Sequence, residues 1–251
     1  MQITLSNKTI DQEAIEILQA YKTDIPFYGG FSGGIDSQII YSLAERARTP
    51  VEWHYNESPI DPTITRNFIK EKYPDVIFSN FSQGFWNYEF MANGMPLRTQ
   101  RWCCRCIKEC GGVGRVKLLG MRREESNKRS CYTEYGDASF QGKNTIWLLP
   151  IVNWTELDRK QYVEEFGLET NPLYKLGFKR TGCILCPNQS KKDVELSLKY
   201  FPKIVNLYKL YCDKYIKMRW ELWNEYGGKD KRRKKPTYKT GEEYFNWAIQ
   251  R

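Results

Sequence analysis

Four cysteines have a spacing that could hold a metal. Cys183 and Cys186 form a C-x2-C pair, and two earlier cysteines can complete a four-thiol set with it in either of two ways. Cys103 with Cys106 makes a second C-x2-C pair, a pattern typical of a tetrahedral zinc site. Cys103 with the adjacent Cys104 is the alternative, because a cubane iron-sulfur cluster has four irons and neighbouring thiolates can serve different corners.

The stretch SGGIDS, residues 32–37, has the residue types of an anion-binding turn. It follows an apolar run and precedes a helical pattern, so backbone N–H groups and the positive end of a helix face whatever binds there. It lacks the lysine of a Walker A loop and is not GxGxxG. The alternative is that these residues form an ordinary strand-to-helix turn that binds no ligand. We expect phosphate binding by these residues: Ser32, Gly33, Gly34, Ile35, Asp36 and Ser37.

The elements around this turn must place it at the edge of a sheet. Apolar spacing predicts helices over residues 9–22, 35–47 and 63–73, alternating with strands within 25–31, 51–56 and 75–80. Alternating strands and helices predict a parallel sheet, whose ligands lie at the carboxyl ends of the strands. The turn lies at such an end.

Later segments extend this pattern. Strands are expected within residues 113–122 and 145–151. A helix should start after Thr155, with Asp158 as its capping partner, and end before Gly167.

The C-terminal region reads as helical and basic. We expect a nucleotide-binding domain over residues 1–190 and a helical extension over 191–251 that packs on it. The apolar face of its aromatic helix should contain Leu207, Leu210, Tyr211, Tyr215 and Met218. The alternative is a stacking platform for nucleic-acid bases.

Composition limits the class of protein. The formal charge of +9 favours an anionic partner such as a nucleotide or nucleic acid. The basic run of residues 229–235 is most simply a solvated loop or tail, and His54 lies inside a strand pattern, where a structural role is expected. With no long apolar run and no signal-peptide pattern, we expect a cytoplasmic protein that has reduced thiols and no membrane partner.

The motifs together carry a family resemblance. SGGIDS after a strand resembles the pyrophosphate loop (PP-loop) of the adenine nucleotide alpha-hydrolase-like superfamily. Five later segments resemble the phosphoadenosine phosphosulfate (PAPS) reductase-like family: RWCCRCIK (101–108), GMRREESNKR (120–129), PIVNW (150–154), NPLYKLGFKRTGC (171–183) and CP (186–187). The resemblance implies an α/β fold, a Rossmann-like parallel sheet flanked by helices, with a metal-binding cysteine insertion and a helical C-terminal region.

The resemblance also implies roles for charged residues. Asp36, Arg122 and Arg129 are the candidate catalytic residues: Asp36 would lie near a Mg²⁺ ion, and the two guanidinium groups would grip phosphate or sulfate. Arg122 would also contact the nucleotide, and Glu125 would orient one arginine. Asp61 loosely matches the family's acidic segment. A salt-bridged surface loop is the plain alternative for residues 120–129.

The cysteines resemble the iron-sulfur signature of adenylylsulfate reductases, a Cys-Cys pair followed by C-x2-C. This resemblance favours a 4Fe-4S cluster on Cys103, Cys104, Cys183 and Cys186, with zinc as the alternative metal. Pro187 after the last ligand is also typical of iron-sulfur segments. The default for Cys110, Cys131 and Cys212 is an ordinary core or surface thiol.

Three functions follow. The first is an ATP-pyrophosphatase-type, AMP-forming enzyme that activates its substrate for sulfur transfer, with nucleic acid or a sulfur or electron donor protein as possible partner. The second is a sulfonucleotide reductase acting on PAPS or adenylylsulfate and releasing sulfite. The family's nucleophilic cysteine lies near the C-terminus, but this sequence has none after Cys212, so a reductase would need the thiol of Cys131 or of another chain. The third is a non-catalytic nucleic-acid-binding protein with a structural zinc.

Overall fold

The computed structural model describes residues 8–80, 84–139, 143–227 and 234–250. It divides into two compact units that interleave along the sequence. Unit 1 comprises Met1–Glu57, Thr63–Ser79 and Glu109–Lys175, and unit 2 comprises Ser58–Pro62, Asn80–Lys108 and Leu176–Arg251. The division into residues 1–190 and 191–251 stays a prediction.

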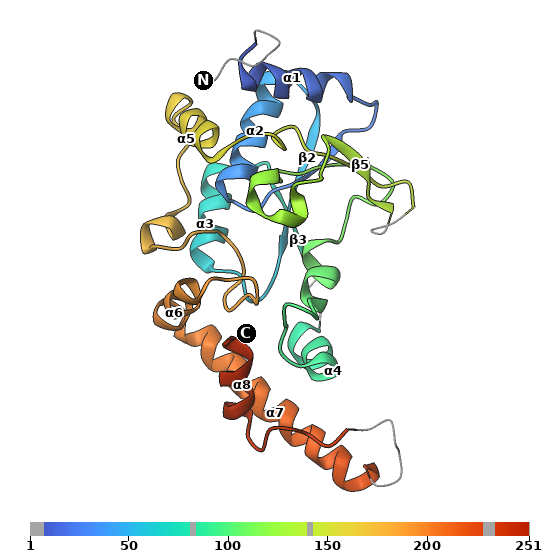
Figure 1. The fold of residues 1–251 in the computed structure, drawn as a ribbon, viewed down its shortest axis with the longest axis vertical. Coiled ribbons are helices and arrows are strands. Elements are labelled where there is room, and N and C mark those ends of the chain that lie inside the picture. The colour runs from blue at the N-terminus through green and yellow to red at the C-terminus, as the bar shows by residue number, and fades with distance from the viewer. Residues whose placement is uncertain (1–7, 81–83, 140–142, 228–233, 251) are drawn as a thin grey trace. The chain divides into compact units, whose positions relative to one another are not determined.

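Unit 1 is built on a six-stranded sheet (Figure 1). Its strand order is β3-β2-β1-β4-β6-β5. β1 pairs in parallel with β2 and β4, β4 pairs in parallel with β6, and β5 is antiparallel to β6. The strands are β1 Phe27–Gly30, β2 Val51–Glu57, β3 Ile77–Asn80, β4 Val116–Leu118, β5 Tyr135–Asp137 and β6 Ile146–Leu148. The expected parallel α/β sheet is confirmed, and β5 is a strand that the apolar pattern did not predict.

Four helices flank this sheet. They are α1 Ile10–Ala20, α2 Ile35–Ala47, α3 Thr63–Lys72 and α5 Glu156–Glu165. The core between helices and sheet is apolar and closed to solvent, with Leu18, Phe27, Ile39, Leu43, Trp53, Leu118 and Tyr162 among its members. The central strand β1 and the helix α2 that follows it are therefore held firmly, and so is the turn between them.

Local signals placed α5 and His54 correctly. The Thr155 side chain accepts from the Asp158 N–H at 3.2 Å, and the Asp158 carboxylate accepts from the Thr155 N–H at 2.8 Å. Gly167, with φ +59°, follows the end of the helix, where a left-handed residue stops it. His54 lies in β2, as the strand pattern predicts, and its ring stacks on Tyr28 with centroids 4.3 Å apart.

Unit 2 is helical. Its elements are η1 Phe85–Phe90, α4 Met91–Asn93, η2 Cys104–Lys108, α6 Lys191–Tyr200, α7 Pro202–Tyr226 and α8 Gly241–Ile249. The helices α7 and α8 lie side by side (Figure 1). They pack closely at Gly241, where a Cβ would lie 2.3 Å from the Asp213 backbone nitrogen. No helix of the described residues is long and apolar enough to cross a membrane.

The buried face of α7 differs in part from the expected one. Val205, Tyr208, Tyr211, Cys212 and Ile216 are its buried residues, whereas Leu210 is 48% exposed. Tyr208 and Tyr211 belong to the core of unit 2, so these rings serve packing rather than a platform for bases. The prediction of the buried face was wrong in part because aromatic and aliphatic residues occur on several sides of this helix. Most of the basic run, residues 229–233, lies outside the described residues.

Candidate functional site

The loop of residues 32–37 follows the end of β1 and includes the first residues of α2. Gly33 has φ +70°, and a Cβ there would come within 3.0 Å of the Ile69 side chain. Gly34 is the N-cap of α2, in an extended conformation and without a side-chain cap. The two glycines thus bring bare backbone to the positive end of a helix at the carboxyl end of the central strand.

Hydrogen bonds inside the loop fix its two serines. Ser32 Oγ donates to Ser37 Oγ at 3.3 Å and accepts from the Gly34 N–H at 3.3 Å. Ser37 Oγ donates to the Gly34 carbonyl at 2.8 Å. The hydroxyls are therefore organised before any ligand binds.

Side chains from outside the loop brace it. Asn171 Nδ2 and Gln38 Nε2 both donate to the Gly33 carbonyl, at 3.1 and 3.2 Å. The Tyr174 hydroxyl accepts from the Ile35 N–H at 3.3 Å. Asn171 is fully buried, and both it and Tyr174 come from the NPLYK segment. That segment carried the family resemblance but no assigned role, since only the tertiary structure shows that it supports the loop.

Arg122 is surrounded by carboxylates. Its side chain is 6% exposed, and its Nε donates to Asp36 Oδ1 at 3.0 Å. One terminal nitrogen donates to Glu124 at 3.1 Å and to the Trp154 carbonyl at 3.3 Å, and the other lies 3.4 Å from Glu156 Oε2. In this structure the guanidinium group binds protein acceptors, so its predicted grip on phosphate would require an exchange of partners.

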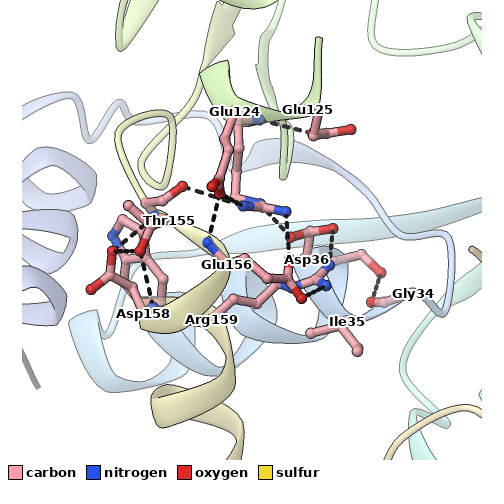
Figure 2. A network of polar contacts seen from close by, with 12 residues as sticks. Gly34, Ile35, Asp36, Glu124, Glu125, Thr155, Glu156, Asp158 and Arg159 are labelled. Atoms are coloured by element: carbon pink, nitrogen blue, oxygen red, sulfur yellow. Dashed lines mark hydrogen bonds and ion pairs between the residues drawn. The ribbon is translucent and has the colours of Figure 1, made fainter. Parts of the chain in front are cut away.

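Arg159 completes the network around Asp36. It donates to Asp36 Oδ2 at 3.2 Å and to Glu156 Oε1, and the labelled side chains converge in Figure 2. Burial alone would lower the pKa of Arg159, but the charges of Asp36 and Glu156 outweigh it and raise the pKa. The sequence pattern did not indicate Arg159, because nothing along the chain shows that this residue of α5 lies beside Asp36 of α2.

The network is closely packed and slightly acidic. The network contains three carboxylates, of Asp36, Glu124 and Glu156, and two guanidinium groups, of Arg122 and Arg159. Its formal charge is therefore −1. The Glu124 carboxylate also accepts from the Glu156 N–H at 2.6 Å, at the start of α5, where the helix dipole favours an anion.

The close approach of β4 to α2 depends on a glycine. A Cβ on Gly120 would lie 2.8 Å from the Asp36 carbonyl oxygen. Any side chain there would push the segment that carries Arg122 away from the loop.

Arg129 lies in the same segment but has a different partner. Its Nη1 forms an ion pair with Glu125 Oε2 at 2.5 Å, so Glu125 contacts one arginine as expected. Glu125 also accepts from the Arg122 N–H at 2.9 Å and thereby ties the segment together. Nearby Cys131 is exposed, and its thiol donates to the Lys128 carbonyl at 3.6 Å.

Four cysteines of unit 2 line one cavity. They are Cys103, Cys104, Cys183 and Cys186, and the lining also includes Lys108, Tyr208 and Pro187. Cys106 is not among the lining residues; it packs at the edge of the unit 2 core. The cavity therefore gathers the thiol set with the adjacent pair.

Asp61 lies beside this cavity rather than in the loop network of unit 1. Its Oδ2 accepts from Lys108 Nζ at 2.6 Å and from the Ser58 N–H at 2.9 Å. Burial alone would lower the pKa of Lys108, but Cys183 and Asp61 raise it, so the ammonium group keeps its charge near the thiols.

The cavity offers four thiol groups as possible metal ligands. No group of three or more His, Cys, Asp or Glu side chains in the described ranges is arranged to hold a metal ion. A cubane spreads its ligands over four irons, so its four sulfurs need not converge on one point. Burial raises the pKa of Cys183 and of Cys186, so these thiols are protonated until a metal displaces the proton.

Known proteins similar to this chain were compared with it. The family model described as "Phosphoadenosine phosphosulfate reductase domain" matches residues 28–189. An uncharacterized protein of Methanocaldococcus jannaschii is 29% identical over 186 residues, which are 70% of this chain and 45% of that protein. The adenosine 5'-phosphosulfate reductase of Streptomyces coelicolor is 37% identical over 89 residues, 34% of this chain and 37% of that one.

One solved structure, the PAPS reductase of Candida auris in a phosphate complex, has 17% identity and a TM-score of 0.48, covering 73% of this chain and 97% of that one. The chain spans less than half the length of the archaeal relatives it matches. The family match covers well over half of the chain and includes the loop, the arginine segment and all four cavity cysteines. The chain therefore belongs to the phosphoadenosine phosphosulfate reductase family, a family of enzymes.

Proposed function

We propose that this protein binds ATP with its phosphates at the loop of residues 32–37 and uses AMP-forming chemistry to activate a substrate for sulfur transfer. The observation that carries the proposal is the loop itself. Gly33 and Gly34 place backbone without side chains at the positive end of α2, and Asn171 and Tyr174 hold that geometry in place.

In the proposed reaction an oxygen of the acceptor forms a bond to the α-phosphorus of ATP. The bond from that phosphorus to the bridging oxygen breaks, pyrophosphate leaves with the electron pair, and the acceptor's proton passes to solvent. A sulfur nucleophile would then bond to the activated atom of the acceptor, and AMP would leave with the electron pair of the bond that breaks. The end of α2 and the guanidinium groups would stabilise the charge that develops on pyrophosphate. Ser32 and Ser37 would donate to phosphate oxygens after exchanging the bonds that they make within the loop.

The acidic network would accept the Mg²⁺ that accompanies ATP. Mg²⁺ favours carboxylate and phosphate oxygens, and Glu124 and Glu156 are 52% and 44% exposed. Asp36 is oriented by Arg122 and Arg159 on its two oxygens. When the nucleotide binds, its phosphates would replace carboxylates as partners of the arginines, and Mg²⁺ would take up the released carboxylates.

We also propose that Cys103, Cys104, Cys183 and Cys186 hold a 4Fe-4S cluster. Their common cavity supports this set of ligands. Such a cluster can carry electrons or supply sulfur. The residues of the chain would anchor it, and Lys108 would balance its negative charge.

A sulfonucleotide reductase is the second candidate, favoured by the adenosine 5'-phosphosulfate reductases among the relatives. Cys131 is exposed and follows residues 120–129 closely in sequence, so it is a thiol near Arg129 that could act as the nucleophile. A zinc-containing nucleic-acid-binding protein has less support, since the cavity omits Cys106 and the α7 rings are buried.

One experiment separates these functions. Anaerobically purified protein is titrated with Mg²⁺ and a non-hydrolysable ATP analogue, and separately with adenosine 5'-phosphosulfate and PAPS. It is then assayed for AMP and pyrophosphate from ATP, with DNA or RNA as acceptor and sulfide as the sulfur nucleophile, and for sulfite from either sulfonucleotide with a thiol reductant. We expect ATP binding and AMP formation. Sulfite release without ATP would establish the reductase instead, and failure to bind any of the nucleotides would overturn both.

A further inference from the structure

The hydroxyl group of Tyr208 is buried without a hydrogen-bond partner. Tyr208 lies on α7 and is 0% exposed, and its Oη has no partner among the described residues. Buried polar groups in folded proteins are nearly always hydrogen-bonded, because losing water without a replacement is costly. Such a hydroxyl group indicates a missing acceptor.

The position of Tyr208 limits what that acceptor can be. Its side chain lines the same cavity as the four cysteines. A tyrosine hydroxyl has an ordinary pKa of about 10, so at neutral pH it holds a proton that it can donate. The ring is fixed edge-on against Trp86, with centroids 5.1 Å apart, so the hydroxyl cannot easily turn elsewhere.

The chemistry of the cavity supplies one kind of acceptor. Neutral thiols are weak acceptors, whereas metal-bound thiolates and bridging sulfides carry negative charge and accept well. Among the other lining residues, Ile60 and Pro96 have no polar side-chain atom, Lys108 can only donate, and Ser58 Oγ already accepts from the Ile60 N–H at 3.4 Å. A cluster sulfur is therefore the acceptor that best satisfies this hydroxyl group.

We propose that Tyr208 Oη donates a hydrogen bond to a sulfur of the 4Fe-4S cluster and so raises its reduction potential and slows its loss. This inference rests on the cluster proposed above. Hydrogen bonds to cluster sulfurs withdraw negative charge, which favours the reduced form. Tyr208 lies outside residues 28–189, so this contact comes from the part of the chain beyond the family match. Tyr208 is a positioning and tuning residue, and it ligates no iron.

Tyr211, one turn further along α7, is a matched control. It is also buried, but its hydroxyl donates to Asn87 Oδ1 at 2.5 Å and is not part of the cavity lining. Tyr208→Phe and Tyr211→Phe each remove a single oxygen and keep the ring.

The test uses the full chain, loaded with cluster under anaerobic conditions. For Tyr208→Phe we expect a lower midpoint potential of the cluster, measured by a redox titration monitored with electron paramagnetic resonance. We also expect this variant to release iron to a chelator about tenfold faster than the unchanged protein. Tyr211→Phe should match the unchanged protein in both. Without the cluster, Tyr208→Phe should unfold at the same urea concentration as the unchanged protein or at a higher one, because it removes an unpaired hydroxyl group. Tyr211→Phe should unfold at a lower urea concentration, because it removes a hydrogen bond.

The outcomes separate this inference from the proposed cluster. If the unchanged protein takes up no iron, or holds zinc alone, both the cluster and the role of Tyr208 are overturned. If it holds the cluster and Tyr208→Phe has the same potential and iron release, only the role of Tyr208 is overturned.

Discussion

Asp36, in the first turn of α2, binds Arg122, which follows β4, through a contact of 3.0 Å between Oδ1 and Nε. The two residues are far apart in sequence, but parallel pairing of β1 with β4 brings the ends of their strands together. A carboxylate beside the proposed phosphate-binding loop would repel a nucleotide if it were unpaired. The arginine offsets this repulsion and fixes the direction of the carboxylate.

The conformation of Gly33 can be tested directly. Gly33→Ala places a Cβ at φ +70° and within 3.0 Å of Ile69, so the loop must shift. We expect the affinity for ATP to fall at least about tenfold, the cost of one lost charge-assisted contact. Calorimetric titration measures it. Gly167→Ala is the control, because its φ is also positive but nothing lies within 4 Å and it is remote in sequence from the loop. Equal losses in both variants would mean that the loop is not the nucleotide site.

The planar guanidinium group of Arg122 should contribute more to nucleotide binding than its positive charge alone. Arg122→Lys keeps the charge but cannot bind three carboxylates at once, so we expect nucleotide affinity and AMP formation to fall by about tenfold or more. Arg123→Lys is the neighbouring control, since Arg123 contacts Tyr132 and Asn153 instead. Urea unfolding of each variant separates loss of function from loss of fold. Similar effects of the two substitutions would assign only general positive charge to the segment.

The two possible sets of metal-binding cysteines predict opposite effects of substitutions at Cys104 and Cys106. Cys104→Ala should lose the iron, and with it the stability that metal binding adds to the folded state, whereas Cys106→Ala should keep about four irons per chain and a brown colour. Iron analysis and absorption spectra of anaerobically purified protein provide the measurement. Colourless protein with one zinc, or iron kept in Cys104→Ala and lost in Cys106→Ala, would establish the zinc set instead.

Acid should weaken the contact between α1 and α2. Burial alone would raise the pKa of Asp11, but hydrogen bonds from Thr9 and Arg46 and the charge of Arg46 outweigh it, and the pKa lies below its usual 3.8. The Asp11–Arg46 pair, 2.6 Å apart, therefore stabilises the fold above pH 3.8, and this contribution disappears as the pH falls through the lowered pKa.

Asp11→Asn should accordingly lower the urea midpoint at pH 7, and its difference from the unchanged protein should shrink below pH 3.8. The exposed Asp24→Asn should change little at either pH. A difference for Asp11→Asn that persists undiminished in acid would show that shape, and not charge, links the helices.

The sequence by itself determined the elements whose signals are local. The helix over residues 35–47 matches α2, because its apolar spacing and the glycines before it act within a few residues. Thr155, Asp158 and Gly167 likewise mark both ends of α5. The strand β5 escaped prediction because three residues show too little alternation and its pairing partner lies in β6.

Only the tertiary structure decided which charged and polar groups meet. Arg159 and Tyr208 had no signal of their own, since each depends on partners that chain folding brings from other elements. The same holds for Arg122, which the family pattern assigned to a phosphate and the structure surrounds with carboxylates. Spacing along a chain limits local conformation, but the energy of a buried charge depends on every group packed around it, and that is settled only when the sheet and helices have assembled.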